Sequence, residues 1–244
     1  MARALPRMNF NRSRLVRSLS GLSLVDVAPS NLSLAERLAQ CLSVSDAIAL
    51  FAALSPGAAR STAARSGAVS AVEEEFARVQ RALADGITGS EGGRARIAFP
   101  TPAADASAEA LGDFSPYRRY YQAQQREMAA RIAPLRAATR EVLAKGSPAL
   151  KQLAAVDAAF DQALRERERD SLAAVPLLLE RHFDQLRKEQ ASIETQPTGD
   201  QPGGWLARFG RDLQDLLLAE LELRLLPVMG LIEAYRSEIV SSNE

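Results

Sequence analysis

The residues best suited to catalysis or metal binding are few in this chain. It has one histidine, His182, and one cysteine, Cys41. A single cysteine excludes a disulfide within the chain, and these two residues cannot supply a Cys/His zinc cluster. A Cys–His or Ser–His nucleophile pair is equally hard to build around one imidazole. We interpret His182 as a helix residue at the edge of a packed face and Cys41 as a small buried hydrophobe.

The acidic pairs and the glycine-rich stretch do not fit known catalytic patterns either. Asp212 with Asp215 and Glu220 with Glu222 lack the Glu-x-x-His motifs that a di-iron bundle requires. The stretch 89–94 has no preceding strand and no Gly-Lys-Ser/Thr ending, so it is not a phosphate loop. We therefore predict that the protein is not an enzyme and that it has no catalytic, metal-binding or cofactor-binding residues. An enzyme of unrecognised type is the third alternative.

Arginines near the N-terminus are the strongest candidates for binding a charged partner. Arginine recurs five times between positions 3 and 17, before the first acid at Asp26. Such a segment can hold the phosphates of nucleic acid or lipid, although no recognisable nucleic-acid motif follows it. A flexible arm or an intramolecular cap explains the same pattern. The candidate interaction residues of this arm are Arg7, Arg12, Arg14 and Arg17.

Composition places the chain among ordinary globular proteins. It has 244 residues, 47% of them hydrophobic and 25% charged, with a formal net charge of zero. This balance disfavours a strongly basic nucleic-acid binder and an acidic tail protein. The longest uncharged stretch, 47–59, is shorter than the roughly 20 apolar residues of a spanning helix. A signal peptide has a continuous apolar stretch after its basic residues, whereas arginines recur through the first 17 residues here. We therefore expect a cytoplasmic protein.

Helical spacing of apolar residues dominates, and strand signals are nearly absent. Ser70 with Glu73 forms a capping box, Ser115-Pro116 marks a helix start, and Pro176 predicts a bend. The fold class is therefore all-α. The expected helices cover 9–20, 31–54 with a break near Asp46, a segment starting at Ser70 and reaching 87, 115–145, 148–193 and 204–240.

The glycines and prolines of 87–113 predict a linker between two parts. The part before it, 1–86, is a smaller helical unit with a basic arm. The part after it, 114–244, consists of long kinked helices that form an elongated bundle or a coiled-coil-like half. We expect the apolar seam of these helices to exceed what one chain can cover, so that self-association or a partner helix buries it. The candidate seam residues are Phe160, Leu164, Leu172, Leu179, Phe183, Leu217 and Leu221.

Several segments resemble a family of uncharacterised β-proteobacterial proteins of unknown function. The similar segments are 5–7, 13–17, 35–38, 45–50, 115–122 and 217–228. The resemblance carries over no catalytic residues. Genes of such families lie beside genes for a stator-like or biopolymer-transport-like membrane protein and a peptidoglycan-binding outer-membrane-type protein. The resemblance thus implies a cytoplasmic accessory of an envelope-associated complex, with a membrane-anchored protein as a possible partner. We expect a non-enzymatic helical scaffold or interaction protein; the alternative is a nucleic-acid-associated protein.

Overall fold

The computed structural model describes residues 13–22, 24, 34–54, 66–89, 97–103, 105, 107–193 and 204–242. Among those residues every regular secondary-structure element is an α-helix, which confirms the prediction of an all-α fold. The helices are α1 (Arg14–Gly21), α2 (Leu34–Cys41), α3 (Val44–Leu54), α4 (Ser66–Thr88), α5 (Ala108–Leu111), α6 (Ser115–Leu143), α7 (Pro148–Ala173), α8 (Val175–Ile193) and α9 (Gly204–Ser242).

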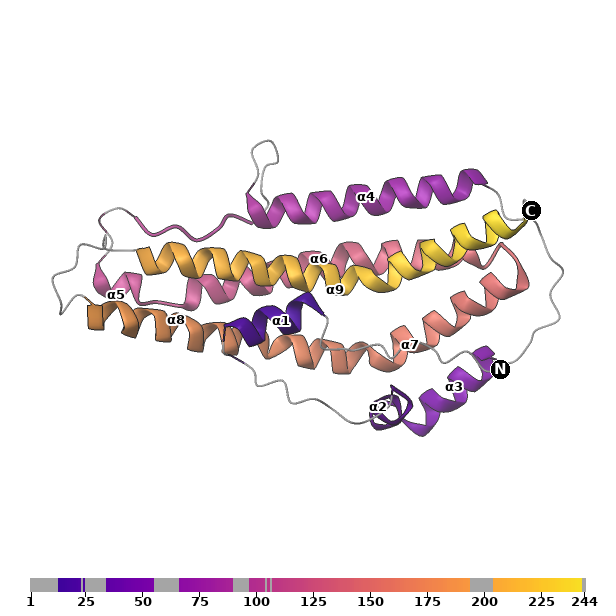
Figure 1. The fold of residues 1–244 in the computed structure, drawn as a ribbon, viewed down its shortest axis with the longest axis horizontal. Helices are drawn as coiled ribbons and strands as arrows, with labels where there is room; N and C mark the ends of the chain where they lie inside the picture. The colour runs from indigo at the N-terminus through magenta and orange to yellow at the C-terminus, as the bar shows by residue number, and fades with distance from the viewer. Residues whose placement is uncertain are drawn as a thin grey trace.

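The long helices form an elongated, flattened bundle (Figure 1). α6 and α9 lie together in the middle, α4 packs along one side, and α7 followed by α8 packs along the other. α4 and the α7–α8 pair run antiparallel to α6 and α9. At 1.5 Å per residue, the 39 residues of α9 extend over about 58 Å. The short α1 lies on α9, and the α2–α3 pair lies on the outer side of α7.

Local sequence signals fix the starts of two long helices. Ser147 caps α7: its hydroxyl accepts a hydrogen bond from the backbone N–H of Leu150 at 3.2 Å, and proline follows at the first helical position. At the start of α6, the carboxylate of Asp113 accepts from the backbone N–H of Ser115 at 2.9 Å. The Ser-Pro signal places both helix starts, but only Ser147 acts as a cap; at α6 the N-cap is Phe114, and Ser115 is the first helical residue.

The bend predicted at Pro176 is a break between two helices. α7 ends at Ala173 and α8 begins at Val175. Proline has no N–H to donate, so the carbonyl of Leu172, four residues earlier, needs another partner. The side-chain amide of Gln125 on α6 donates to that carbonyl at 3.1 Å. The backbone N–H of Ala174 donates to the same carbonyl, so a local bond and a tertiary bond together replace the one that proline cannot make.

The capping box predicted at Ser70 is wrong, because α4 already begins at Ser66. The reason lies in packing: Val69 is 7% exposed and belongs to a core cluster with Leu231 and Tyr235 of α9. Burial of this turn against α9 extends the helix beyond the local signal. Glu73 forms an ion pair with Arg236 of α9.

The helix before the expected linker and the helices after it share one hydrophobic core. Leu83 and Ile87 of α4 belong to the same buried cluster as Tyr121 and Met128 of α6 and residues of α8 and α9. Part of the expected linker also packs on the bundle. Phe99 contacts the ring of Tyr120 with centroids 5.2 Å apart.

The expectation that the seam of the long helices stays uncovered within one chain is wrong. Leu179, Phe183 and Leu217 are fully buried, and Leu172 and Leu221 are 6% and 3% exposed. α8 packs on α9, and α6 covers another side of α9. The helices therefore cover one another, and these five side chains are buried in the core.

Candidate functional site

The candidate arginines divide into paired, exposed and undescribed residues. Arg14 donates to Glu222 of α9 at 2.6 Å and lies 3.9 Å from Asp215. Arg17 is exposed on the same helix. Arg7 and Arg12 lie outside the residues that the structure describes. Because the guanidinium of Arg14 already contacts two carboxylates of α9, fewer of its N–H donors are available to a phosphate.

The candidate residue Phe183 lies at the centre of an aromatic cluster. Its ring centroid is 5.0 Å from that of Phe209, 5.1 Å from Trp205 and 5.6 Å from Phe114. Tyr117 completes the cluster, 5.3 Å from Phe209. These tilted and edge-on contacts join α6, α8 and α9, and each such pair adds about 1 kcal/mol to the energy of burial. Phe183 therefore has a role in stability.

The remaining seam residues, Phe160 and Leu164, lie on α7 where α2 and α3 run alongside it. The side chain of Gln152 donates to the carbonyl of Leu54 at 2.6 Å, and Arg167 donates to the carbonyl of Gln40 at 3.2 Å. Phe160 and Leu164 fall between these two anchors and are half-buried. The α2–α3 pair thus runs along the stretch of α7 where self-association or a partner helix was expected.

The outer face of α3 carries the largest group of exposed apolar side chains on one described helix. Val44, Ile48, Phe51 and Leu54 are 80%, 65%, 73% and 57% exposed. They recur at steps of four, three and three, so they share one side of the helix. Leu50, which lies about 100° away around the helix, is 8% exposed and is the buried residue of α3. We call the four exposed residues the α3 stripe.

A capping box holds the first turn of α3, at the break that the sequence predicts near Asp46. The backbone N–H of Ser43 donates to the Asp46 carboxylate at 2.9 Å, and the Ser43 hydroxyl accepts from the backbone N–H of Asp46 at 3.2 Å. The Ser43 hydroxyl also lies 2.6 Å from the same carboxylate. These hydrogen bonds, first that of the hydroxyl, hold the pKa of Asp46 below its usual range.

We predict that acid weakens α3. Because the pKa of Asp46 is lowered in the folded state, its carboxylate stabilises the cap above the usual carboxyl pKa of about 3.9, and this contribution is lost as pH falls through the folded value. Amide-exchange protection factors over 44–50 should fall in acid relative to neutral pH. In Asp46→Asn, protection should already be reduced at neutral pH. Equal protection in both proteins at pH 7 would contradict the role of this cap.

A buried carboxylate occupies the centre of the bundle, and it belongs to one of the acidic pairs that fit no catalytic pattern in the sequence. Glu220 of α9 is fully buried and accepts from the hydroxyl of Tyr121 at 2.7 Å. It also accepts from Gln125 at 3.1 Å and lies 2.8 Å from a guanidinium nitrogen of Arg224. Burial, followed by the nearby Glu220 carboxylate, raises the pKa of Tyr121 well above 10. A sequence signal existed: Glu220 follows Leu217 by three residues on the apolar stripe of α9.

A second charged network joins α6 to α7. Arg136 contacts Asp157 at 2.6 Å and Asp161 at 2.9 Å, and Arg140 lies 3.1 Å from both carboxylates. Burial alone would raise the pKa of Asp161, but the charges of Arg136, Arg140 and Arg165 outweigh it and lower that pKa. Every polar partner comes from the chain itself, so this network fixes how α6 packs on α7.

Arg136→Met should lower the free energy of unfolding by about 2 kcal/mol, because it removes charge-assisted hydrogen bonds to two partly buried carboxylates. Urea denaturation monitored by circular dichroism measures this loss. The matched control is Arg165→Met: Arg165 contacts Asp161 at 3.2 Å, but its side chain is 69% exposed. Its loss should cost less than about 0.5 kcal/mol. Equal losses in the two variants would contradict a structural role for the network.

Other groups with catalytic potential do not converge on a site in the described part of the chain. His182 is 4% exposed, and its Nε2 lies 2.8 Å from the Asp212 carboxylate. Cys41 is half-buried, which corrects its interpretation as a buried residue. The described residues contain no group of three or more His, Cys, Asp or Glu side chains that could hold a metal ion.

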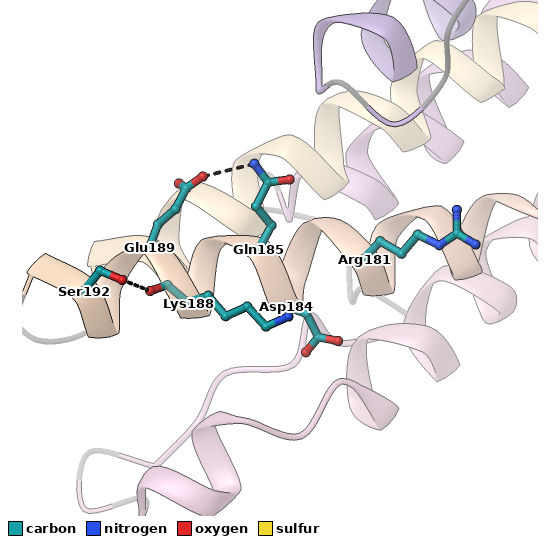
Figure 2. Close-up of a pocket in the computed structure, with 6 residues that line it drawn as sticks. All are labelled: Arg181, Asp184, Gln185, Lys188, Glu189 and Ser192. Atoms are coloured by element: carbon teal, nitrogen blue, oxygen red, sulfur yellow. Dashed lines mark hydrogen bonds between the residues drawn. The ribbon is translucent and has the colours of Figure 1, made fainter.

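A shallow hollow on α8 is formed by side chains of that helix alone (Figure 2). Gln185 donates to Glu189 at 3.0 Å, and the Ser192 hydroxyl donates to the carbonyl of Lys188 at 2.9 Å. These polar groups are engaged with one another along the helix, as Figure 2 shows. The described lining residues are Arg181, Asp184, Gln185, Lys188, Glu189 and Ser192.

Fold and surface together define a helical-bundle protein with an exposed apolar stripe on an outer helix. The chain belongs to a family of proteins of unknown function, DUF3348, whose match covers residues 1–237. No curated protein and no solved structure matches it. Among the described residues, no helix is long and apolar enough to cross a membrane.

Proposed function

We propose that this protein is a non-enzymatic helical scaffold that acts through protein–protein contact at the α3 stripe. The bundle, held by the aromatic cluster and the two charged networks, is the rigid body of the scaffold. α3 is attached to it from outside and presents apolar side chains to solvent. Membership of a family of unknown function is compatible with this proposal.

The α3 stripe is the observation that carries the proposal. Among the eight exposed large hydrophobic residues of the described chain, four lie on α3, which has only 11 residues. Scattered apolar residues are normal on protein surfaces, but a contiguous group typically marks a binding surface. Water around such a group is released when a partner covers it, which supplies the driving force for binding.

We further propose that the scaffold works in the cytoplasm as an accessory of an envelope-associated complex. Its partner in that complex is a membrane-anchored protein. The gene neighbourhood implied by the family resemblance supports this assignment. The alternative, binding of nucleic acid by the arginine arm, depends on Arg7, Arg12 and Arg17, because Arg14 is engaged with acids of α9. Deletion of residues 1–20 that abolishes a salt-dependent gel shift would favour that alternative.

The proposal is tested by crosslinking in living cells. A photo-crosslinking amino acid at Ala47, exposed beside the stripe, should yield one discrete protein adduct. Adding Ile48→Glu should abolish the adduct, because it places a charge in the apolar contact. The same probe at Arg126, exposed on α6, should not yield that adduct. Adducts from Ala47 that persist with Ile48→Glu would contradict contact through the stripe.

A further inference from the structure

Segment 97–103, between α4 and α5, lies on the bundle without helical structure and is held there by side chains (Figure 1). The ring centroid of Phe99 is 5.2 Å from that of Tyr120 and 6.0 Å from that of Tyr117, both on α6. Ile97 also packs against the main core cluster. Within the described part of the chain, the hydrogen bond of this segment is internal: the hydroxyl of Thr101 donates to the carbonyl of Phe99 at 3.5 Å. We call residues 97–103 the strap.

A glycine on α9 makes room for the ring of Phe99. Gly210 is buried inside a long helix, where glycine is less favourable than alanine. A Cβ atom at position 210 would lie 3.1 Å from Cζ of Phe99, which is closer than most Cβ contacts in proteins. The missing side chain therefore leaves a notch between α6 and α9 that accepts one aromatic ring. The strap is held by the fit of this ring, because its backbone adds no hydrogen bond to the helices in the described part of the chain.

Tyr120 connects the strap to the C-terminal end of α4. Its ring contacts Phe99, and its hydroxyl donates to the carbonyl of Ile87 at 3.2 Å. Gln214 of α9 donates to the same carbonyl at 3.2 Å. The last carbonyls of a helix have no partner within that helix, so these two side chains supply the missing donors. A movement of the Tyr120 ring therefore changes the hydrogen bonding at the end of α4.

The two ends of α4 are anchored separately. Leu83 and Ile87, near the C-terminal end, are 2% and 1% exposed and belong to the same core cluster as the tyrosines that contact the strap. Val69, near the N-terminal end, belongs to the other core cluster. Glu73 is paired with Arg236 of α9. Because the anchors of the N-terminal end do not include the strap, loss of the strap contact acts on the C-terminal end alone.

We propose that the strap is a releasable lock on residues 79–88 of α4, and that it acts through Tyr120. With Phe99 in the notch, the Tyr120 hydroxyl stays at the carbonyl of Ile87 and this half of α4 stays on α6 and α9. With Phe99 withdrawn, this half opens while the N-terminal half stays docked, and Leu83 and Ile87 become accessible. A half-buried segment held by side chains alone is of the kind that opens well below the free energy of global unfolding. This inference goes beyond the proposed function, since it involves no residue of the α3 stripe.

Hydrogen exchange of the full chain, measured by mass spectrometry, tests the lock. Phe99→Ala should speed amide exchange over 80–88 at least about fivefold, because opening no longer requires withdrawal of the ring. Exchange over 69–74 should stay as in the natural protein. An unchanged rate over 80–88, or an equal increase in both segments, would overturn the inference.

Phe160→Ala is the matched control, since it removes the same ring from another half-buried position, on α7. It should leave the ratio of the exchange rates over 80–88 and 69–74 unchanged. A selective increase over 80–88 in this variant as well would overturn the specific role of the strap. If Phe99→Ala fails to fold, Phe99→Leu keeps an apolar side chain without the ring and should give a smaller selective increase.

The notch can be tested from the side of α9. Gly210→Ala improves the helix propensity of α9, yet it should speed exchange over 80–88, because the added methyl group displaces the ring of Phe99. In a Phe99→Ala background, the same substitution should no longer speed exchange. Slower exchange over 80–88 in Gly210→Ala alone would overturn the notch as the seat of Phe99.

The connection through Tyr120 is tested by a double-mutant cycle. Tyr120→Phe keeps the ring beside Phe99 but removes the hydroxyl that donates to Ile87. Phe99→Ala should therefore speed exchange over 80–88 by a smaller factor in Tyr120→Phe than in the natural protein. Equal factors in the two backgrounds would overturn the action of the strap through Tyr120.

Discussion

Replacing Glu220 with alanine will lower the free energy of unfolding by about 3–5 kcal/mol, because it leaves Arg224 without its buried partner. The hydroxyl of Tyr121 and the amide of Gln125 lose an acceptor at the same time. For a chain of this size, the loss should lower the melting temperature by about 10 °C. Differential scanning calorimetry measures both quantities.

Two further variants separate the charge of Glu220 from its shape. Glu222→Ala, two residues along α9 on the exposed side, should change stability by about 0.5 kcal/mol or less. The double variant Glu220→Leu with Arg224→Leu should recover part of the loss, because apolar pairs often replace buried ion pairs without cost. If Glu220→Ala melts like the natural protein, the buried network does not contribute to stability.

Replacing Phe183 with alanine should cost about 3–5 kcal/mol of unfolding free energy, as is usual for large rings in tightly packed cores. Phe183 is fully buried, and its ring contacts Phe209 and Trp205 of α9. The prediction also separates two roles, since an interface residue would change association and leave the stability of the monomer unaltered. Chemical denaturation at low protein concentration measures the monomer alone.

Phe51→Ala is the matched control, because it removes the same ring from a position that is 73% exposed. It should leave the free energy of unfolding within about 0.5 kcal/mol of the natural protein's and weaken protein contact at the α3 stripe instead. Strong destabilisation by Phe51→Ala together with a mild effect of Phe183→Ala would reverse the assignment of core and surface.

The helices could be predicted from local sequence signals, but their arrangement in the bundle could not. The Ser-Pro steps at 115 and 147 act through nearby backbone groups, so their effect is readable from sequence. The buried side of α6, in contrast, includes tyrosine, glutamine and threonine, such as Tyr121, Gln124 and Thr139. Because these residues weaken its apolar periodicity, α6 was not recognised as the helix that covers the seam of α9.

The sequence showed the helical spacing of the α3 stripe but not whether this side of the helix is buried or exposed. The three-residue step from Ile48 to Phe51 shows that they share a face of the helix. The same spacing occurs on buried and on exposed faces, so spacing alone does not distinguish the two. α3 is apolar on more than one side, which is typical of a buried helix. Only the burial of Leu50 and the contact of α3 with α7 show which side is covered. The charged networks depend on pairs far apart in sequence, such as Tyr121 with Glu220, which spacing cannot predict.

The middle position of α9 constrains how this protein is made in the cell. Ribosomes release α4, α6 and α8 before α9, yet α9 packs on each of them. Until Leu213, Leu217 and Val228 emerge, the nascent chain has no central helix around which to close. Rings such as Phe183 then remain accessible to chaperones and to aggregation during synthesis. A stop codon ahead of α9 should therefore yield an insoluble or degraded product rather than a smaller folded domain.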